Sequence, residues 1–179
     1  MRRPRVPAAL LLMAVLLMAA PGVATAQSLE NSVKANYLAR FAAFIQWPPG
    51  SGPTGNGPLV ICVIGDDPFD RQLDQALEGQ SVNGHRIAAR RLTRLEAGSG
   101  CHIAYLAGSS SQSVAAALAA AGRGTLTVTD EARGSDRGAI HFTLFQTRVR
   151  FHVDTGQASR RGLTISSRLL SLALSVRES

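Results

Sequence analysis

Cysteine and histidine, the residues of most metal and thiol sites, are scarce in this chain of 179 residues. There are two cysteines and four histidines, and the cysteines lack C-x-x-C spacing. Zinc-ribbon and thioredoxin-like chemistry therefore has no support. The H-E-x-x-H, G-x-S-x-G and P-loop motifs are absent, and no residues combine as a nucleophile, a base and an oxyanion donor. The sequence predicts a protein that is not an enzyme and holds no catalytic residues, metal or cofactor.

Lysine is almost absent, since Lys34 is the only one among nineteen basic residues. The formal net charge is +7, but three arginines lie in the first five residues, in a segment that we expect to be removed. Sixteen basic residues then face twelve acidic ones, a net charge of +4. The arginines form no stripe along the sequence, so we expect no nucleic-acid partner.

The apolar run near the start, Ala8 to Ala20, has thirteen residues and is too short to span a membrane, which takes roughly 20 residues. Arg2, Arg3 and Arg5 precede it, and the small-x-small pattern Ala24-Thr25-Ala26 follows. These are the three parts of a secretory signal peptide. No lipobox cysteine follows the run, which argues against a lipid anchor. We expect residues 1–26 to be a signal peptide, cleaved near Ala26, and residues 27–179 to be a single periplasmic domain.

A helix is predicted over residues 29–46, because apolar residues recur there at helical spacing. Trp47 and two prolines would end it. Its aromatic residues Phe41 and Phe44, with Trp47, are expected mostly to pack in the core. Any part left exposed is a candidate contact for a partner or for a second copy in a homodimer.

Strand and helix signals alternate through the middle of the chain. Apolar or β-branched runs at 59–64, 86–92, 102–106 and 125–129 predict strands, and helical patterns lie between them. This alternation predicts an α/β fold with a largely parallel twisted sheet and helices on both faces. A helix is also predicted at the end of the chain, from Ser166 past Val176.

Strict alternation near residues 140–153 predicts a C-terminal antiparallel hairpin. If Gln146 and Thr147 are the turn residues, every apolar side chain falls on one face, and His141 lies opposite His152. Two opposed imidazoles can hold Zn²⁺, but no third ligand can be named. The alternative is a half-exposed histidine pair without metal.

The turn Gly65-Asp66-Asp67-Pro68 follows a buried strand, where α/β proteins often bind phosphate. It lacks the other glycines of a dinucleotide site, and two carboxylates would repel an anion. Asp67 is therefore interpreted as a helix N-cap. A receiver domain is rejected, because the strand ending at Ala107 lacks an aspartate.

Cys62 and Cys101 form an even pair in a chain that we expect to be exported, which suggests one disulfide. Their strands would have to be neighbours for the Cα atoms to come within range. The alternative is two separate buried thiols.

A series of short motifs resembles the YfiR-like periplasmic proteins. The motifs occur in order and cover most of residues 30–174; they are Val33-Lys34-Ala35-Asn36-Tyr37-Leu38 with Phe41, Trp47-Pro48, Ile61-Cys62-Val63-Ile64-Gly65 with Asp67-Pro68-Phe69, Cys101-His102-Ile103, Thr125-Leu126-Thr127-Val128-Thr129-Asp130, Arg150-Phe151-His152-Val153 and Leu163-Thr164-Ile165-Ser166-Ser167-Arg168-Leu169-Leu170. The resemblance implies a regulator that binds and represses the periplasmic sensor region of an inner-membrane diguanylate cyclase. It would thereby lower cyclic-di-GMP and limit biofilm.

The resemblance further implies a homodimer, an outer-membrane lipoprotein as a second partner, and a structural disulfide carried over to Cys62 and Cys101. Some members have a second cysteine pair near the hairpin, and this chain has none there, which puts redox control by a second bridge in doubt. Two alternatives to the regulator stay open. One is a small-molecule binding module with a cleft near Gly65, Gly108 and Asp130; the other is a hydrolase without a familiar motif.

Overall fold

The computed structural model describes residues 22–178. The predicted signal peptide falls mainly on residues 1–21, which lie outside the described residues, and its last five residues belong to the first described helix. Within residues 22–178, no helix combines the length and apolar character that crossing a membrane requires.

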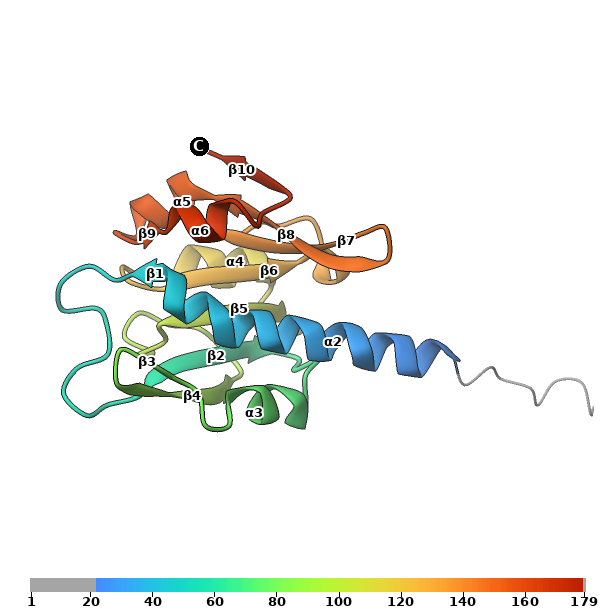
Figure 1. Ribbon diagram of the computed structural model, residues 1–179, viewed down its shortest axis with the longest axis horizontal. Coiled ribbons are helices and arrows are strands. Elements are labelled where there is room, and N and C mark those ends of the chain that lie inside the picture. The colour runs from blue at the N-terminus through green and yellow to red at the C-terminus, as the bar shows by residue number, and fades with distance from the viewer. Residues whose placement is uncertain (1–21, 179) are drawn as a thin grey trace, which may run out of the picture.

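An eight-stranded sheet runs through the molecule in the order β10-β8-β7-β6-β5-β2-β4-β3 (Figure 1). Its strands are β2 (Leu59–Gly65), β3 (Ser81–Val82), β4 (His85–Leu92), β5 (Ile103–Gly108), β6 (Leu126–Asp130), β7 (Ile140–Phe145), β8 (Arg148–Asp154) and β10 (Ser175–Arg177). The five central strands are β7, β6, β5, β2 and β4, and they are parallel to one another. Strand β8 runs antiparallel to β7. The predicted fold class is confirmed, with β2 and β5 at the point where the strand order reverses.

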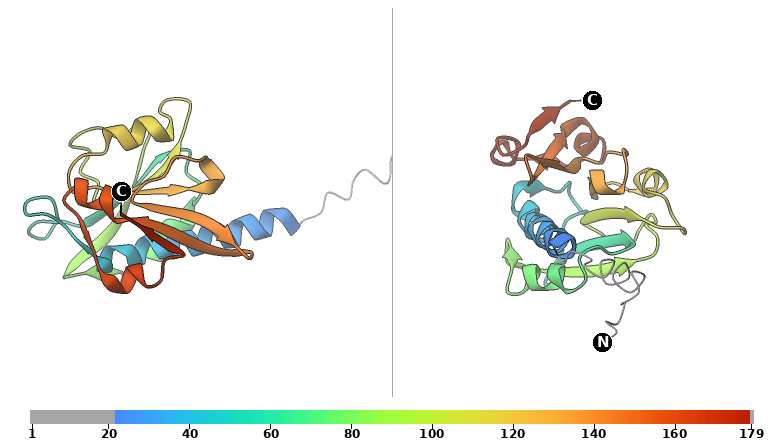
Figure 2. Two further views of the ribbon diagram at one scale, coloured as in Figure 1. Left: turned by 90° about the horizontal axis from the view of Figure 1, so that it is seen from above. Right: turned by 90° about the vertical axis from the view of Figure 1, so that its right-hand side faces the viewer.

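Helices cover both faces of the sheet, as Figure 2 shows. They are α2 (Gly22–Phe41), α3 (Arg71–Leu77), α4 (Val114–Ala120), α5 (Thr155–Arg160) and α6 (Ser167–Leu170), with 3₁₀ turns η2 (Ala42–Phe44) and η3 (Glu131–Arg133). Alternate residues of β2 face opposite layers: Ile61 and Val63 pack in the larger core cluster beneath α2 and α3, and Ile64 packs in a smaller cluster with Val114 of α4.

Helix α2 differs from the predicted helix over residues 29–46. It ends at Phe41, and after η2 the short strand β1 (Ile45–Gln46) pairs with β9 (Thr164–Ile165). The amide of Ser166 also donates to the Phe44 carbonyl at 2.9 Å. Pairing with a distant segment therefore ends the helix before the prolines do.

The hairpin β7–β8 has the predicted register, with Phe142 opposite Phe151 and His141 opposite His152. The two turn residues are Gln146 and Thr147, both with positive φ. Beyond the hairpin, Ser166 caps α6 as predicted, but the helix stops at Leu170. The predicted continuation past Val176 is wrong, because Val176 lies in β10 and pairs with Val153 of β8.

Candidate functional site

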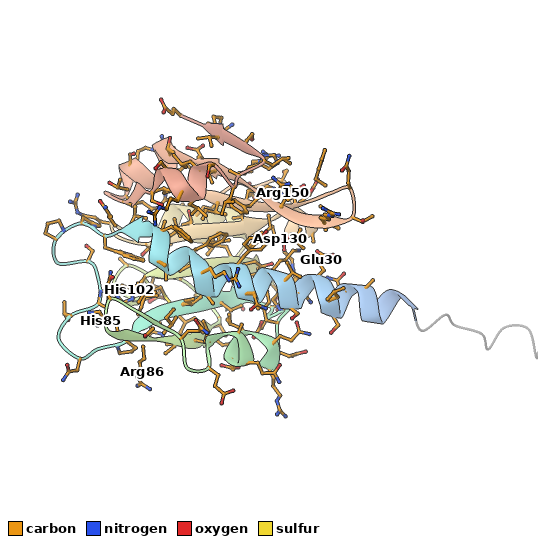
Figure 3. The ribbon with its side chains drawn as sticks, in the orientation of Figure 1. Glu30, His85, Arg86, His102, Asp130 and Arg150 are labelled. Carbon is orange, nitrogen blue, oxygen red and sulfur yellow. A yellow bond between two sulfur atoms is a disulfide. The ribbon has the colours of Figure 1, made fainter. Side chains whose placement is uncertain are left out.

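A buried ion network ties α2 to the carboxyl end of the parallel sheet, between the residues Glu30 and Asp130 that Figure 3 labels. The Lys34 ammonium nitrogen lies 2.5 Å from Asp130 Oδ2 and 2.5 Å from Glu30 Oε1. The Tyr105 hydroxyl donates to the same Asp130 oxygen at 2.8 Å, and the Ala132 amide donates to the other oxygen at 3.0 Å. Only 1% of Lys34 and 4% of Asp130 is exposed. Both carboxylate oxygens of Asp130 are therefore engaged inside the protein.

The groups of this network hold one another in fixed protonation states. Burial is the largest cause that raises the pKa of Tyr105, and the neighbouring Asp130 carboxylate adds to it. The phenol therefore stays protonated and remains a hydrogen-bond donor. A buried charge is costly unless it is paired, so each member depends on the others. The network holds the helix on the sheet and leaves Asp130 unable to bind a ligand unless α2 moves.

The crevice between the carboxyl ends of β2 and β5 is closed by the backbone. In a doubly wound sheet, ligands bind where the strand order reverses. Here a Cβ atom on Gly65 would lie 2.3 Å from the Gly108 carbonyl oxygen, and the Asp66 amide donates to that oxygen at 3.0 Å. An open depression of about 480 Å³ lies beside this contact and includes Gly108 and Arg133. Of the three residues of the predicted small-molecule cleft, Gly108 lines this depression, whereas Gly65 and Asp130 do not.

Asp67 does not cap a helix, because α3 begins at Arg71. One Asp67 oxygen accepts from the Phe69 amide at 2.7 Å, and the other lies 2.9 Å from Arg91 Nε. Arg91 also binds Asp74, whose pKa its hydrogen bonds lower. The acidic turn is thus held to β4 by an arginine and offers no anion site.

Cys62 and Cys101 form a disulfide with a Cα–Cα distance of 5.7 Å. Cys62 lies in β2 and Cys101 directly precedes the neighbouring strand β5, so pairing of these strands brings the thiols together. Cys62 is fully buried and Cys101 is 6% exposed. The bond lies within the smaller core cluster, a position suited to a structural bridge.

His141 and His152 lie opposite each other with ring centroids 6.5 Å apart. The Nδ1 atom of His141 is 2.8 Å from the Thr129 hydroxyl, and Nδ1 of His152 is 2.6 Å from the Ser175 hydroxyl. Burial lowers the pKa of both histidines, that of His141 to about 4. Among residues 22–178, no group of three or more metal-ligating side chains comes together.

The three aromatic residues proposed as partner contacts have different environments. Phe41 is 1% exposed and packs on Phe142 and Phe151, so it belongs to the core and offers no surface. Phe44 and Trp47 are half-buried. The Trp47 ring packs edge-on against His102, whose pKa burial lowers. Only Phe44 and Trp47 remain candidates for a contact.

An apolar groove of about 850 Å³ runs between α2 and the β7–β8 hairpin. Leu29 and Val33 line it from the helix, Leu144 from the hairpin, and Leu172 from the segment after α6. We call this feature the hairpin groove.

Neither the network nor the groove was predicted from the sequence. Lys34 lies four residues before the buried Leu38 and four after Glu30. That spacing, in the only lysine of the chain, is a signal of burial with a partner. Nothing in the sequence indicated that Leu144 is exposed, because alternation alone places it on the core face of the hairpin.

The fold and these features together define a class of protein. It is a doubly wound α/β domain whose buried charges serve its own folding and whose distinctive exposed feature is an apolar groove. The family comparison gives this class a name: the family model described as YfiR/HmsC-like matches residues 31–174, and the chain belongs to this family. No curated protein sequence matches the chain.

Proposed function

We propose that this protein is a periplasmic repressor of an inner-membrane diguanylate cyclase, binding the periplasmic sensor region of that enzyme. Membership of the YfiR/HmsC-like family over residues 31–174 carries the proposal, because this is a family of periplasmic regulators of diguanylate cyclases. The disulfide between Cys62 and Cys101 suits an oxidising compartment. The hairpin groove offers a surface for a macromolecule rather than a pocket for a metabolite.

A repressor of this kind acts through a difference in affinity. It holds the cyclase inactive only if it binds the inactive state more tightly than the active one. Moving a two-state equilibrium from almost all active to almost all inactive takes a difference of about 10⁴-fold. The proposal further includes an outer-membrane lipoprotein that competes for the protein under stress, and a homodimer as a resting form.

Gene deletion in the bacterium tests the proposal. Loss of the protein should raise cyclic-di-GMP and biofilm, and deletion of the cyclase encoded beside it should cancel the rise. A gene lacking the codons for residues 2–20 is a matched control, because its product should stay in the cytoplasm and fail to complement. Unchanged cyclic-di-GMP in the single deletion, with both proteins made, would contradict the proposal.

Export and cleavage of the signal peptide are tested by a separate measurement. Intact-mass analysis of periplasmic extract should show a chain that begins at Gln27. A periplasmic form that retains residues 8–20 would contradict the predicted cleavage.

A further inference from the structure

The hairpin groove gathers most of the exposed apolar side chains. Six large hydrophobic residues are exposed among those that the structure describes, and four of them line the groove: Leu29 at 68%, Val33 at 36%, Leu144 at 52% and Leu172 at 54%. They come from three segments far apart in the sequence. Isolated exposed apolar residues need no explanation, but a cluster at a groove marks an interaction surface.

The groove lies beside α2, on the sheet face that α2 covers. Both α2 and the β7–β8 hairpin extend past the rest of the sheet on the same side of the molecule (Figure 1). Helix α6 lies on the same side of the sheet as α2 but away from the tip of the hairpin, and it has only four residues. Leu144 and Val149 stand on the sheet face beside α2, at the groove. The face of a sheet is covered by helices, whereas an added strand would pair at an edge, so the groove fits a helix.

The rim of the groove is positively charged. Arg148 and Arg150 are among its lining residues, although in the hairpin register their side chains start from the face that carries Phe145, and Arg150 reaches the groove at the Leu172 carbonyl. Glu30 is the one acidic residue among the residues that line it. The Glu30 carboxylate is already bound to Lys34. Arg150 makes one long hydrogen bond, 3.5 Å to the Leu172 carbonyl, and Arg148 has no side-chain hydrogen bond or ion pair within residues 22–178. Two guanidinium groups are therefore free to meet carboxylates of a partner.

The same charges argue against a second copy in the groove. A symmetric dimer would bring identical surfaces together. Arg148 and Arg150 of each copy would then approach the same arginines of the other, and the bound Glu30 would not offset them. Like charges placed across an interface are unfavourable, so a different and acidic partner suits the groove better.

We propose that the hairpin groove binds an amphipathic helix of the cyclase's periplasmic region, with its apolar side between α2 and the hairpin and its carboxylates on Arg148 and Arg150. This inference rests on the proposed function. It adds the surface used and the chemistry of the segment recognised.

Two adjacent hairpin residues give a matched test. Leu144 and Phe145 are exposed to similar extents, 52% and 46%, but alternation in β7 puts them on opposite faces, and only Leu144 lines the groove. Binding of the processed protein to the purified periplasmic region of the neighbouring cyclase is measured by calorimetry. Leu144→Ser should weaken binding by about tenfold or more, and Phe145→Ser, which adds no charge beside its cross-strand neighbour Arg148, by less than about twofold. Thermal unfolding checks that both variants fold.

A second pair of variants tests the charge. Arg148→Glu should weaken binding about tenfold. Arg86→Glu, on an exposed arginine of β4 that Figure 3 shows far from the groove, should leave binding unchanged. Replacing an acidic residue of the partner helix by arginine should restore binding to Arg148→Glu.

The outcomes separate this inference from the proposed function. If the native protein binds the cyclase region but Leu144→Ser and Phe145→Ser behave alike, the groove is wrong and the repressor function stands. If the native protein does not bind that region at all, both fail. If sedimentation shows that Leu144→Ser turns a dimer into a monomer while cyclase binding is unchanged, the occupant is a second copy and the inference is overturned.

Discussion

The Lys34 ammonium lies 2.5 Å from the Asp130 carboxylate, although 96 residues separate them in the sequence. The pair joins the first described helix to the carboxyl end of β6, and Glu30, Tyr105 and the Ala132 amide also contact its two charges. Since α2 also forms one wall of the hairpin groove, the position of that wall depends on this buried pair.

Removal of the lysine should be strongly destabilising. Lys34→Met leaves the Asp130 carboxylate buried without its counter-charge, and breaking a buried pair in this way costs about 3–5 kcal/mol. Urea unfolding measures the loss, with Arg40→Met as the control on the exposed side of the same helix. Equal free energies of unfolding for the two variants would show that the pair contributes nothing.

The disulfide should stabilise the protein through its unfolded chain. Cys62 and Cys101 are 39 residues apart, and the chain-entropy model gives about 3–4 kcal/mol for a loop of this size. The double variant Cys62→Ala/Cys101→Ala should lower the free energy of unfolding by that order. Alkylation of the denatured protein without reductant checks the bond itself, and labelling of both cysteines would refute it.

The sequence was sufficient to predict the hairpin but not the ends of the helices. Alternation in residues 140–153 puts every apolar side chain on one face if Gln146 and Thr147 form the turn, so the hydrophobic pattern was enough to predict the register, although Gln-Thr is a poor pair for such a turn. The helix over 29–46 rested on one signal, apolar spacing, which continues past Phe41. Whether Ile45 joins a helix or a strand is decided by Ile165, its partner 120 residues further along the chain.

The candidate site was less predictable because it too depends on residues far apart in the sequence. Burial of Lys34 needs Asp130 at the end of β6, and the hairpin groove needs the relative lengths of α2, α6 and the hairpin. These are properties of the assembled sheet. The motifs of the family identified the class of protein, but no short motif marks the groove.

Acidification should destabilise the protein partly through His141. Burial, with the positive charge of Arg137 second, lowers the pKa of His141 from 6.5 to about 4. The unfolded chain binds this proton near pH 6.5 and the native protein only near pH 4, so stability is full above pH 6.5 and falls as the pH drops towards 4. The loss is up to roughly 3 kcal/mol across that window.

The variant His141→Asn isolates this effect. The asparagine oxygen can take the place of Nδ1 beside the Thr129 hydroxyl, and it does not titrate. Asp130 and Glu131 interact with the charge of His141, whereas the other carboxyl groups keep their surroundings, so the difference between the curves of stability against pH reports His141 together with these two neighbours. Urea unfolding from pH 7.5 to 4.5 should give a flatter curve for the variant. Parallel curves would contradict the assignment.

Exchanging the residues of the two hairpin turns tests whether backbone conformation strains one of them. Asn83 and Gly84 connect β3 to β4 with φ of 52° and 82°, and Gln146 and Thr147 connect β7 to β8 with φ of 50° and 62°. Asn-Gly is the preferred pair for such a turn, whereas a β-branched residue at positive φ is strained. Gln146→Asn/Thr147→Gly should therefore raise the free energy of unfolding by about 1 kcal/mol or more, after the entropy that the glycine adds to the unfolded chain. The reciprocal change, Asn83→Gln/Gly84→Thr, should lower it by a similar amount. Thermal unfolding of both variants decides the matter: if the hairpin variant is no more stable than the native protein, the strain at Thr147 is already relieved by its surroundings.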